Sequence, residues 1–168
     1  EAVFLRHDGF DALRLAIALA SAFSACLYLR FVGTPPSPMR TALKTFTIAS
    51  LTALPLTYLG AGPLWPLAGL TLALALSALG DFMLALERQE RFFVLGLASF
   101  LAAHIAFIGV MLPYAAVPQG AALAMILAAA AAASGFLAWL LPALGRMRIP
   151  VLAYFAVILA MVATALSI

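Results

Sequence analysis

Residues 64–86 read LWPLAGLTLALALSALGDFMLAL, an apolar run that contains a single charged side chain, Asp81. A helix rises 1.5 Å per residue, so about 20 apolar residues cross the roughly 30 Å hydrocarbon core of a bilayer. The same composition extends over the whole chain, since 67% of the 168 residues are hydrophobic and 9% are charged. Soluble domains are about half apolar and a quarter charged, which excludes a water-soluble globule. The sequence predicts an all-α, polytopic membrane helix bundle.

Five further apolar segments accompany this run, and the chain is long enough for about six transmembrane helices. The expected spans are roughly 12–32, 41–59, 64–86, 91–112, 119–141 and 149–168, within one integral membrane domain over 1–168. Proline and glycine separate them, as in Pro35-Pro36 after the first span and Gly60 to Pro63 after the second.

Basic residues occur in alternate loops. The first loop and its flanks carry Arg30, Arg40 and Lys44, the third carries Arg88 and Arg91, the fifth carries Arg146 and Arg148, and the second and fourth carry none. The positive-inside rule then assigns loops one, three and five to the cytoplasm and predicts a multi-pass protein of the cell membrane, of the bacterial inner-membrane type. Arg6 and Arg14 conflict with this orientation. Because the positive charge belongs to the loops, no nucleic-acid partner is expected.

Two ionisable residues lie inside predicted spans: Asp81 in the third and His104 near the middle of the fourth. An Asp at a helix centre costs about 2.5–3.5 kcal/mol on insertion scales, so such residues usually face the bundle interior and mark a site. Ser77 precedes Asp81 by four residues and shares its helix face. If the connecting turn is short, Ser77 lies level with about residue 101 and Asp81 with about residue 97. His104 then lies one turn from Ser77 and two turns deeper than Asp81, so the geometry allows a shared pocket in which a water or a substrate group bridges Asp81 and His104.

Structural roles compete with this interpretation. Asp81 could be a helix-end acid paired with Arg88 or Arg91, and His104 could be a structural hydrogen-bonding residue. Lys44 could be a positive-inside anchor, and Phe100 and Tyr154 could be packing residues. No H-E-x-x-H motif occurs and two histidines cannot build a three-His zinc site, so neither a metal nor a cofactor is expected. The remaining chemistry is acid/base catalysis by a carboxylic acid and a histidine.

Residues 76–84, LSALGDFML, resemble the S-x-x-G-D-x-x-L signature of the YhhN family of integral membrane proteins, which includes the lysoplasmalogenases. Phe93, Gly96, Phe100, Ala103 and His104 fit the family's next pattern, F-x-x-G-x-x-x-F-x-x-A-H, and Pro150, Val151, Tyr154 and Met161 fit its later P-V-x-x-Y and methionine positions. There are two departures. Lys44 is followed by Thr45, where the family has proline. The family's later G-A-x-x-F-x-x-S-D motif is not found, so the chain is expected to lack the last two spans.

The resemblance implies hydrolysis of the vinyl-ether bond of lysoplasmalogens in a membrane, without a cofactor. Asp81 would be the general acid, His104 would position or deprotonate water, and Ser77 would orient either of them. Lys44 would meet the lipid phosphate, and Phe100 and Tyr154 would contact the substrate. The alternative is a non-catalytic, lipid-binding accessory subunit of a larger membrane assembly.

Overall fold

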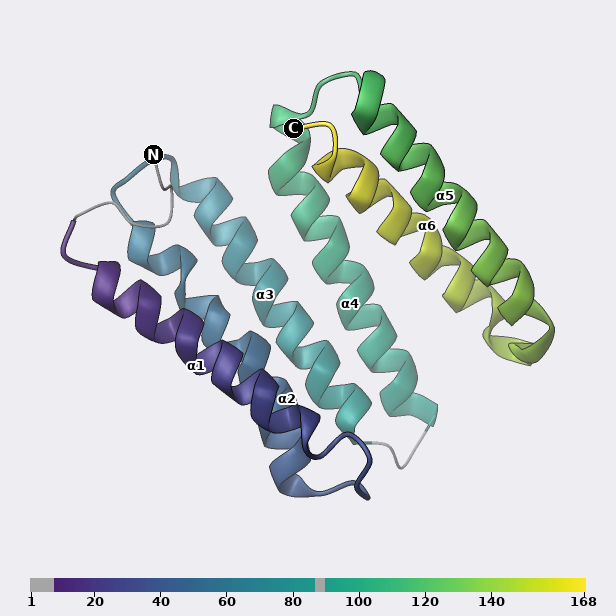
Figure 1. Cartoon of the computed structure of the whole chain (residues 1–168), viewed down its shortest axis with the longest axis horizontal. Coiled ribbons are helices and arrows are strands. Elements are labelled where there is room, and N and C mark those ends of the chain that lie inside the picture. The colour runs from purple at the N-terminus through teal and green to yellow at the C-terminus, as the bar shows by residue number, and fades with distance from the viewer. Residues whose placement is uncertain (1–7, 87–89) are drawn as a thin grey trace. The chain divides into compact units, whose positions relative to one another are not determined.

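The computed structural model describes residues 8–86 and 90–168, and the chain divides into two compact units, Glu1–Ala103 and His104–Ile168. Each unit is described by itself. The regular structure of the described residues is helical (Figure 1). The α-helices are α1 (Asp11–Leu29), α2 (Pro38–Ala49), α3 (Leu64–Ala85), α4 (Glu90–Met111), α5 (Gly120–Leu140) and α6 (Arg148–Ala165). Among the described residues, five helices are long and apolar enough to cross a membrane, so the all-α, multi-pass prediction is confirmed.

In the first unit, α1 and α2 form an antiparallel pair joined by hydrogen bonds from serine side chains (Figure 1). The Ser21 hydroxyl donates to the Thr47 carbonyl at 2.6 Å, and the Ser24 hydroxyl donates to the Leu43 carbonyl at 2.9 Å. Both serines are buried. Small polar residues of this kind let membrane helices approach closely and hold them together where water is absent.

The segment predicted as a second span, 41–59, is an α-helix only in its first half. Ser37 caps α2 by accepting the Arg40 backbone N–H at 3.2 Å, and Pro38 occupies the first turn. After Ala49 the chain continues as two 3₁₀ turns, η1 (Ser50–Ala53) and η2 (Pro55–Tyr58). Proline lacks the N–H that an α-helix needs, so Pro55 leaves the carbonyl of Leu51, four residues earlier, without an α-helical donor. That 41–59 crosses the membrane stays a prediction.

Glycine lets α3 and α4 approach closely. Gly96 of α4 is buried, and a Cβ at this position would lie 2.8 Å from Leu84 Cγ and 3.2 Å from the carbonyl oxygen of Gly80. Because any side chain would push the helices apart, only glycine fits here. The contact also sets the register, since Gly80 and Leu84 of α3 lie level with the first turns of α4, close to the expected alignment.

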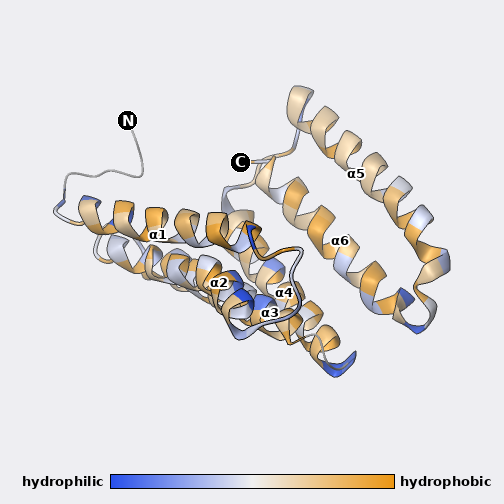
Figure 2. Ribbon diagram, turned by 60° about the horizontal axis from the view of Figure 1, so that its bottom comes forward, coloured by the Kyte–Doolittle hydropathy of each residue, from blue (hydrophilic) through white to orange (hydrophobic). Residues whose placement is uncertain are grey.

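The second unit contains the end of α4, then η3 (Leu112–Tyr114), α5, η4 (Leu141–Ala143), η5 (Gly145–Met147) and α6. Phe136 of α5 stacks on Phe155 of α6, with ring centroids 6.1 Å apart. The N–H of Ala116 donates to the carbonyl of Ser167 at 2.7 Å. None of the apolar window of α5 is buried, and Figure 2 shows that apolar residues predominate along α5 and α6. Such helices suit contact with lipid.

Candidate functional site

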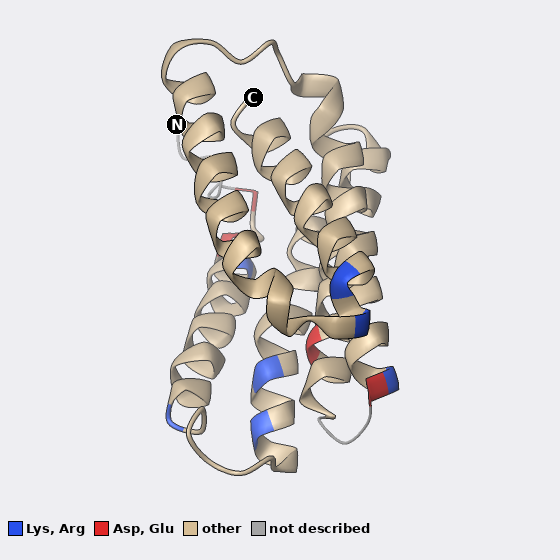
Figure 3. Cartoon of the chain, turned by 90° about the vertical axis from the view of Figure 1, so that its right-hand side faces the viewer, with Lys and Arg blue, Asp and Glu red and all other residues tan. Residues whose placement is uncertain are grey.

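The carboxylate predicted from the sequence to be catalytic forms an ion pair with a basic side chain of a neighbouring helix. Asp81 lies near the end of α3, and its Oδ1 is 3.3 Å from Nζ of Lys44 in α2. The two side chains are 16% and 27% exposed. Figure 3 shows basic positions on α2 and the acidic position on α3 at the same end of this unit. The interhelical ion pair therefore joins two residues that the sequence predicted separately, one as catalytic and one as substrate-binding.

In its alternative role as a helix-end acid, Asp81 was predicted to pair with Arg88 or Arg91, which follow it in the sequence. The guanidinium of Arg91 lies 4.9 Å from the ring centroid of Phe92, its neighbour in α4. Arg88 lies outside the described residues. Among the described residues, the ion pair observed for Asp81 is with Lys44 of α2, and its pairing with Arg88 or Arg91 stays a prediction.

Ser77 occupies the α3 face one turn before Asp81. Its hydroxyl donates to the carbonyl of Ala73 in the same helix at 2.9 Å. The oxygen can still accept a hydrogen bond, so Ser77 is suited to hold a donor near Asp81 rather than to act as a nucleophile.

Phe100 packs beside the site. A Cβ on Gly80 would lie 2.7 Å from ring atoms of Phe100, and Gly80 is buried. The Phe100 ring therefore covers the α3 backbone next to Asp81. A substrate contact for Phe100 stays a prediction.

In the second unit, two predicted site residues lie together. The rings of His104 in α4 and Tyr154 in α6 meet edge to face, with centroids 5.5 Å apart and planes at 88°. Such aromatic pairing fixes the orientation of an imidazole. The structure thus brings together Asp81 with Lys44 in one unit and His104 with Tyr154 in the other.

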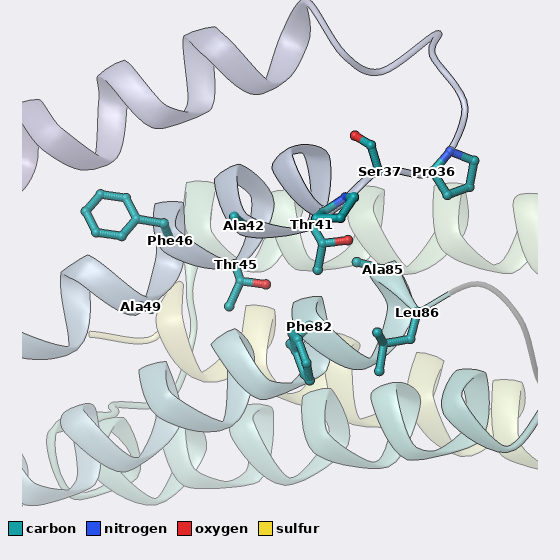
Figure 4. A pocket seen from close by; sticks show the side chains of 11 residues that line it. Pro36, Ser37, Thr41, Ala42, Thr45, Phe46, Ala49, Phe82, Ala85 and Leu86 are labelled. Carbon is teal, nitrogen blue, oxygen red and sulfur yellow. The ribbon is translucent and has the colours of Figure 1, made fainter.

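A groove of about 1040 Å³ is lined by residues of α2 and α3 (Figure 4). It is lined by Pro36, Ser37, Pro38, Thr41, Ala42, Thr45, Phe46, Ala49, Phe82, Ala85 and Leu86. A small recess of about 20 Å³ adjoins it and is lined by Tyr28, Pro36, Arg40, Thr41, Lys44, Leu84 and Ala85. The groove was not predicted from the sequence, although Thr41 and Thr45 lie four residues apart and so share a face of α2.

Arg14, which conflicted with the charge pattern, forms a buried polar cluster. Its side chain is fully buried and donates to Asp8 at 2.9 and 2.8 Å, Asp11 at 2.8 Å, the Thr57 hydroxyl at 3.0 Å and the Thr57 carbonyl at 2.8 Å. Its guanidinium carbon lies 4.1 Å from the ring centroid of Tyr58. All five N–H groups are used, so this cluster holds α1 against η2. The hydrogen bonds from Arg14 lower the pKa of Asp8. In the sequence, this cluster is indicated by two acidic residues close to Arg14, since Asp11 and Asp8 lie three and six residues before it.

Apolar helices enclosing an interhelical ion pair define a multi-pass α-helical membrane protein with a candidate polar site inside its bundle. The family model of the YhhN family matches residues 39–168, and the chain belongs to this family. Over 98 residues it is 45% identical to proteins named lysoplasmalogenase from Mycobacterium bovis and Mycobacterium tuberculosis. The aligned stretch is 56% of this chain and 38% of each relative, so the chain spans about two fifths of their length. No solved structure matches.

Proposed function

We propose that this protein is a membrane-embedded lysoplasmalogenase of the cell membrane, which hydrolyses the vinyl-ether bond of lysoplasmalogens. Membership of the YhhN family and the names of the mycobacterial relatives support this assignment. The observation that carries it is the ion pair between Asp81 and Lys44, at 3.3 Å and largely removed from solvent. Ionisable residues within membrane helices are unfavourable for insertion and generally serve a function.

The chemistry needs a proton donor beside the lipid. A vinyl ether is protonated at the carbon atom remote from its oxygen, and the resulting oxocarbenium ion takes up water. Loss of a proton gives a hemiacetal, which separates into an aldehyde and a glycerophospho-alcohol. In the proposed mechanism, Asp81 donates the first proton. If His104 only positions the water, the proton that the water loses returns to Asp81; if His104 takes this proton, solvent reprotonates Asp81.

Lys44 would link binding to this proton transfer. The phosphate of an arriving lysolipid competes with Asp81 for the ammonium group of Lys44. A carboxylate that loses its counter-charge between membrane helices takes up a proton, because an unpaired charge is unfavourable there. Substrate binding would thereby convert Asp81 into the acid that the reaction requires. His104 remains our candidate to position or deprotonate the water, with Tyr154 against its ring, and Ser77 our candidate to orient the acid.

The test is turnover by the purified full-length protein. It is incubated with lysoplasmalogen and, separately, with an ester lysophospholipid, and free aldehyde and fatty acid are measured. We expect aldehyde from the vinyl ether, and Asp81→Asn should lower its release about 100-fold or more if Asp81 is the general acid. Glu90→Gln, at an exposed carboxylate of α4, is the matched control and should retain activity.

Two outcomes would overturn the proposal. Full turnover by Asp81→Asn would remove the acid from the mechanism. Binding of the lysolipid without release of aldehyde would favour the alternative, a lipid-binding accessory subunit.

A further inference from the structure

We propose that the groove between α2 and α3 binds the hydrocarbon chain of a single-chain phospholipid, with the lipid phosphate at Arg40 and Lys44. The choice of this ligand rests on the proposed function. The volume of the groove, the order of its lining residues and one buried hydroxyl group support this ligand.

The polar side chains that line the groove, Ser37, Thr41 and Thr45, belong to the start and middle of α2, whereas its far end at Ala49 is apolar. Ser37 and Thr41 lie in the first turns of α2, at the end of the unit that the positive-inside rule assigns to the cytoplasmic surface. Ala49 lies at the other end of α2, and Phe82 faces the groove from α3 (Figure 4). A lipid with its headgroup at the surface and its chain directed into the bilayer has the same order of polarity. The volume also matches a ligand site, since such pockets measure about 300–1,000 Å³.

Positive charge adjoins the polar end. The recess with Arg40 and Lys44 shares Pro36, Thr41 and Ala85 with the groove, so the two basic side chains lie next to the groove. The recess itself has room for about one oxygen-sized group, such as a single phosphate oxygen. A phosphate monoester or diester is the anion expected at a membrane surface, and Arg and Lys are its usual partners.

Thr45 marks the position of the lipid backbone. Several helical hydroxyls donate to the carbonyl four residues earlier, namely Thr47, Thr71, Ser77, Ser99 and Thr164. In the described part of the chain, the hydroxyl oxygen of Thr45 is buried with no hydrogen-bond partner, and its residue lines the groove. A buried polar group without a partner is unfavourable by about 1–3 kcal/mol, so an oxygen atom of the bound ligand is its expected acceptor.

This position connects the groove with the reaction. Thr45 follows Lys44 and Phe82 follows Asp81, so the groove residues and the ion pair lie at the same level of the two helices. A glycerol or ether oxygen held by Thr45 would place the head of the hydrocarbon chain beside Asp81. The rest of the chain would continue along Phe46 and Ala49.

Photolabelling tests the proposal directly. The probe is a saturated ether lysophosphatidylethanolamine with a diazirine at the end of its chain, which has no vinyl ether to cleave. It is added to the full-length protein in phosphatidylcholine nanodiscs, irradiated, and located by peptide mass spectrometry. We expect labelling of 38–49 and 79–86, and competition by unlabelled lysoplasmalogen but not by diacyl phosphatidylethanolamine.

Matched variants supply the second measurement. Ala42→Trp places bulk in the groove and should reduce labelling about tenfold, whereas Ala75→Trp, at an exposed alanine of α3 outside the groove, should leave it unchanged. Thr45→Val removes only the hydroxyl and should weaken labelling about fivefold. Thr71→Val is its control, because the Thr71 hydroxyl bonds within its own helix at 2.8 Å.

The outcomes separate this proposal from the proposed function. Labelling of the groove by the probe in a protein that releases no aldehyde would uphold the groove and reject the hydrolase. Labelling confined to other helices, or equal labelling of Ala42→Trp and Ala75→Trp, would reject the groove whether or not the protein hydrolyses lysoplasmalogen. Equal competition by the diacyl lipid would reject a site for a single-chain lipid.

Discussion

Gly80 illustrates how a signature residue can serve packing rather than chemistry. A methyl group there would lie 2.7 Å from the Phe100 ring, whereas Gly109 of α4 has open space around its Cβ position. We expect Gly80→Ala to lower the free energy of unfolding by about 1–3 kcal/mol, as overpacking does, and Gly109→Ala to be neutral or slightly stabilising. Thermal unfolding in detergent measures both. Equal stability of the two variants would contradict the close packing of Phe100 on Gly80.

The ion pair between Lys44 and Asp81 can be dissected by a double-mutant cycle. Lys44→Met alone leaves a carboxylate without its counter-charge, and we expect a loss of about 1–3 kcal/mol, between the values for exposed and buried pairs. The combination with Asp81→Asn should restore most of that stability, because no charge is then left unpaired. Unfolding and aldehyde release are measured on all four proteins. A double variant that is stable but inactive separates the structural role of the pair from its chemical role, and an active one would contradict both proposed roles.

Asp8 should make the stability of the protein sensitive to acid. Hydrogen bonds from Arg14 lower the pKa of Asp8 in the folded state below its ordinary value of 3.8. A carboxyl with a depressed folded pKa stabilises the fold fully above its unfolded pKa, and this contribution is lost as the pH falls from about 3.8 through the lower folded value. Melting temperatures between about pH 6 and pH 3 should therefore fall more steeply for the natural protein than for Asp8→Asn. Parallel curves would argue against the bond to Arg14.

At the scale of elements, the pairing of α1 with α2 depends on hydroxyl groups. Ser21 and Ser24 each donate across the helix pair, whereas Ser99 donates to Leu95 of its own helix at 2.9 Å. Interhelical hydrogen bonds in membrane proteins average about 0.6 kcal/mol, so Ser21→Ala with Ser24→Ala should cost about 1 kcal/mol and Ser99→Ala close to nothing. Urea or SDS titration of the folded protein measures the difference. A double variant as stable as Ser99→Ala would show that apolar packing alone holds the two helices.

The helices themselves follow from the sequence, because a long apolar run in a bilayer has few alternatives to a helix. The approximate register of α3 and α4 also follows, since a short turn leaves little freedom. Pro55 indicates a break in the helical pattern of 41–59, whereas the length of this apolar run favours one continuous span. The partner of Asp81 was not predictable in this way: Lys44 lies 37 residues earlier, and only the packing of α2 on α3 brings the two together.

At the scale of the molecule, charge distribution decides orientation. The position of Arg14 conflicts with the predicted orientation, but its guanidinium is fully buried and paired with Asp8 and Asp11. A neutralised, buried arginine is an internal hydrogen-bonding group and does not act as a loop charge. The sequence shows where Arg14 lies along the chain, but only the fold shows that its side chain is buried and cannot interact with the membrane surface. The orientation inferred from Arg30, Arg40 and Lys44 then has one fewer exception.

This orientation predicts which side of the membrane each end of the first unit faces. Gly33 lies between α1 and α2, and Gly62 lies between η2 and α3; both have open space at the Cβ position, so a cysteine fits at either. In a Cys26→Ala background, which removes the chain's single cysteine, Gly33→Cys should react with an impermeant maleimide only from the cytoplasmic side and Gly62→Cys only from the opposite side. Labelling of right-side-out and inverted vesicles distinguishes the two. If both cysteines reacted from one side, 38–58 would not cross the membrane, and the surface assigned to the polar end of the groove would have to be revised.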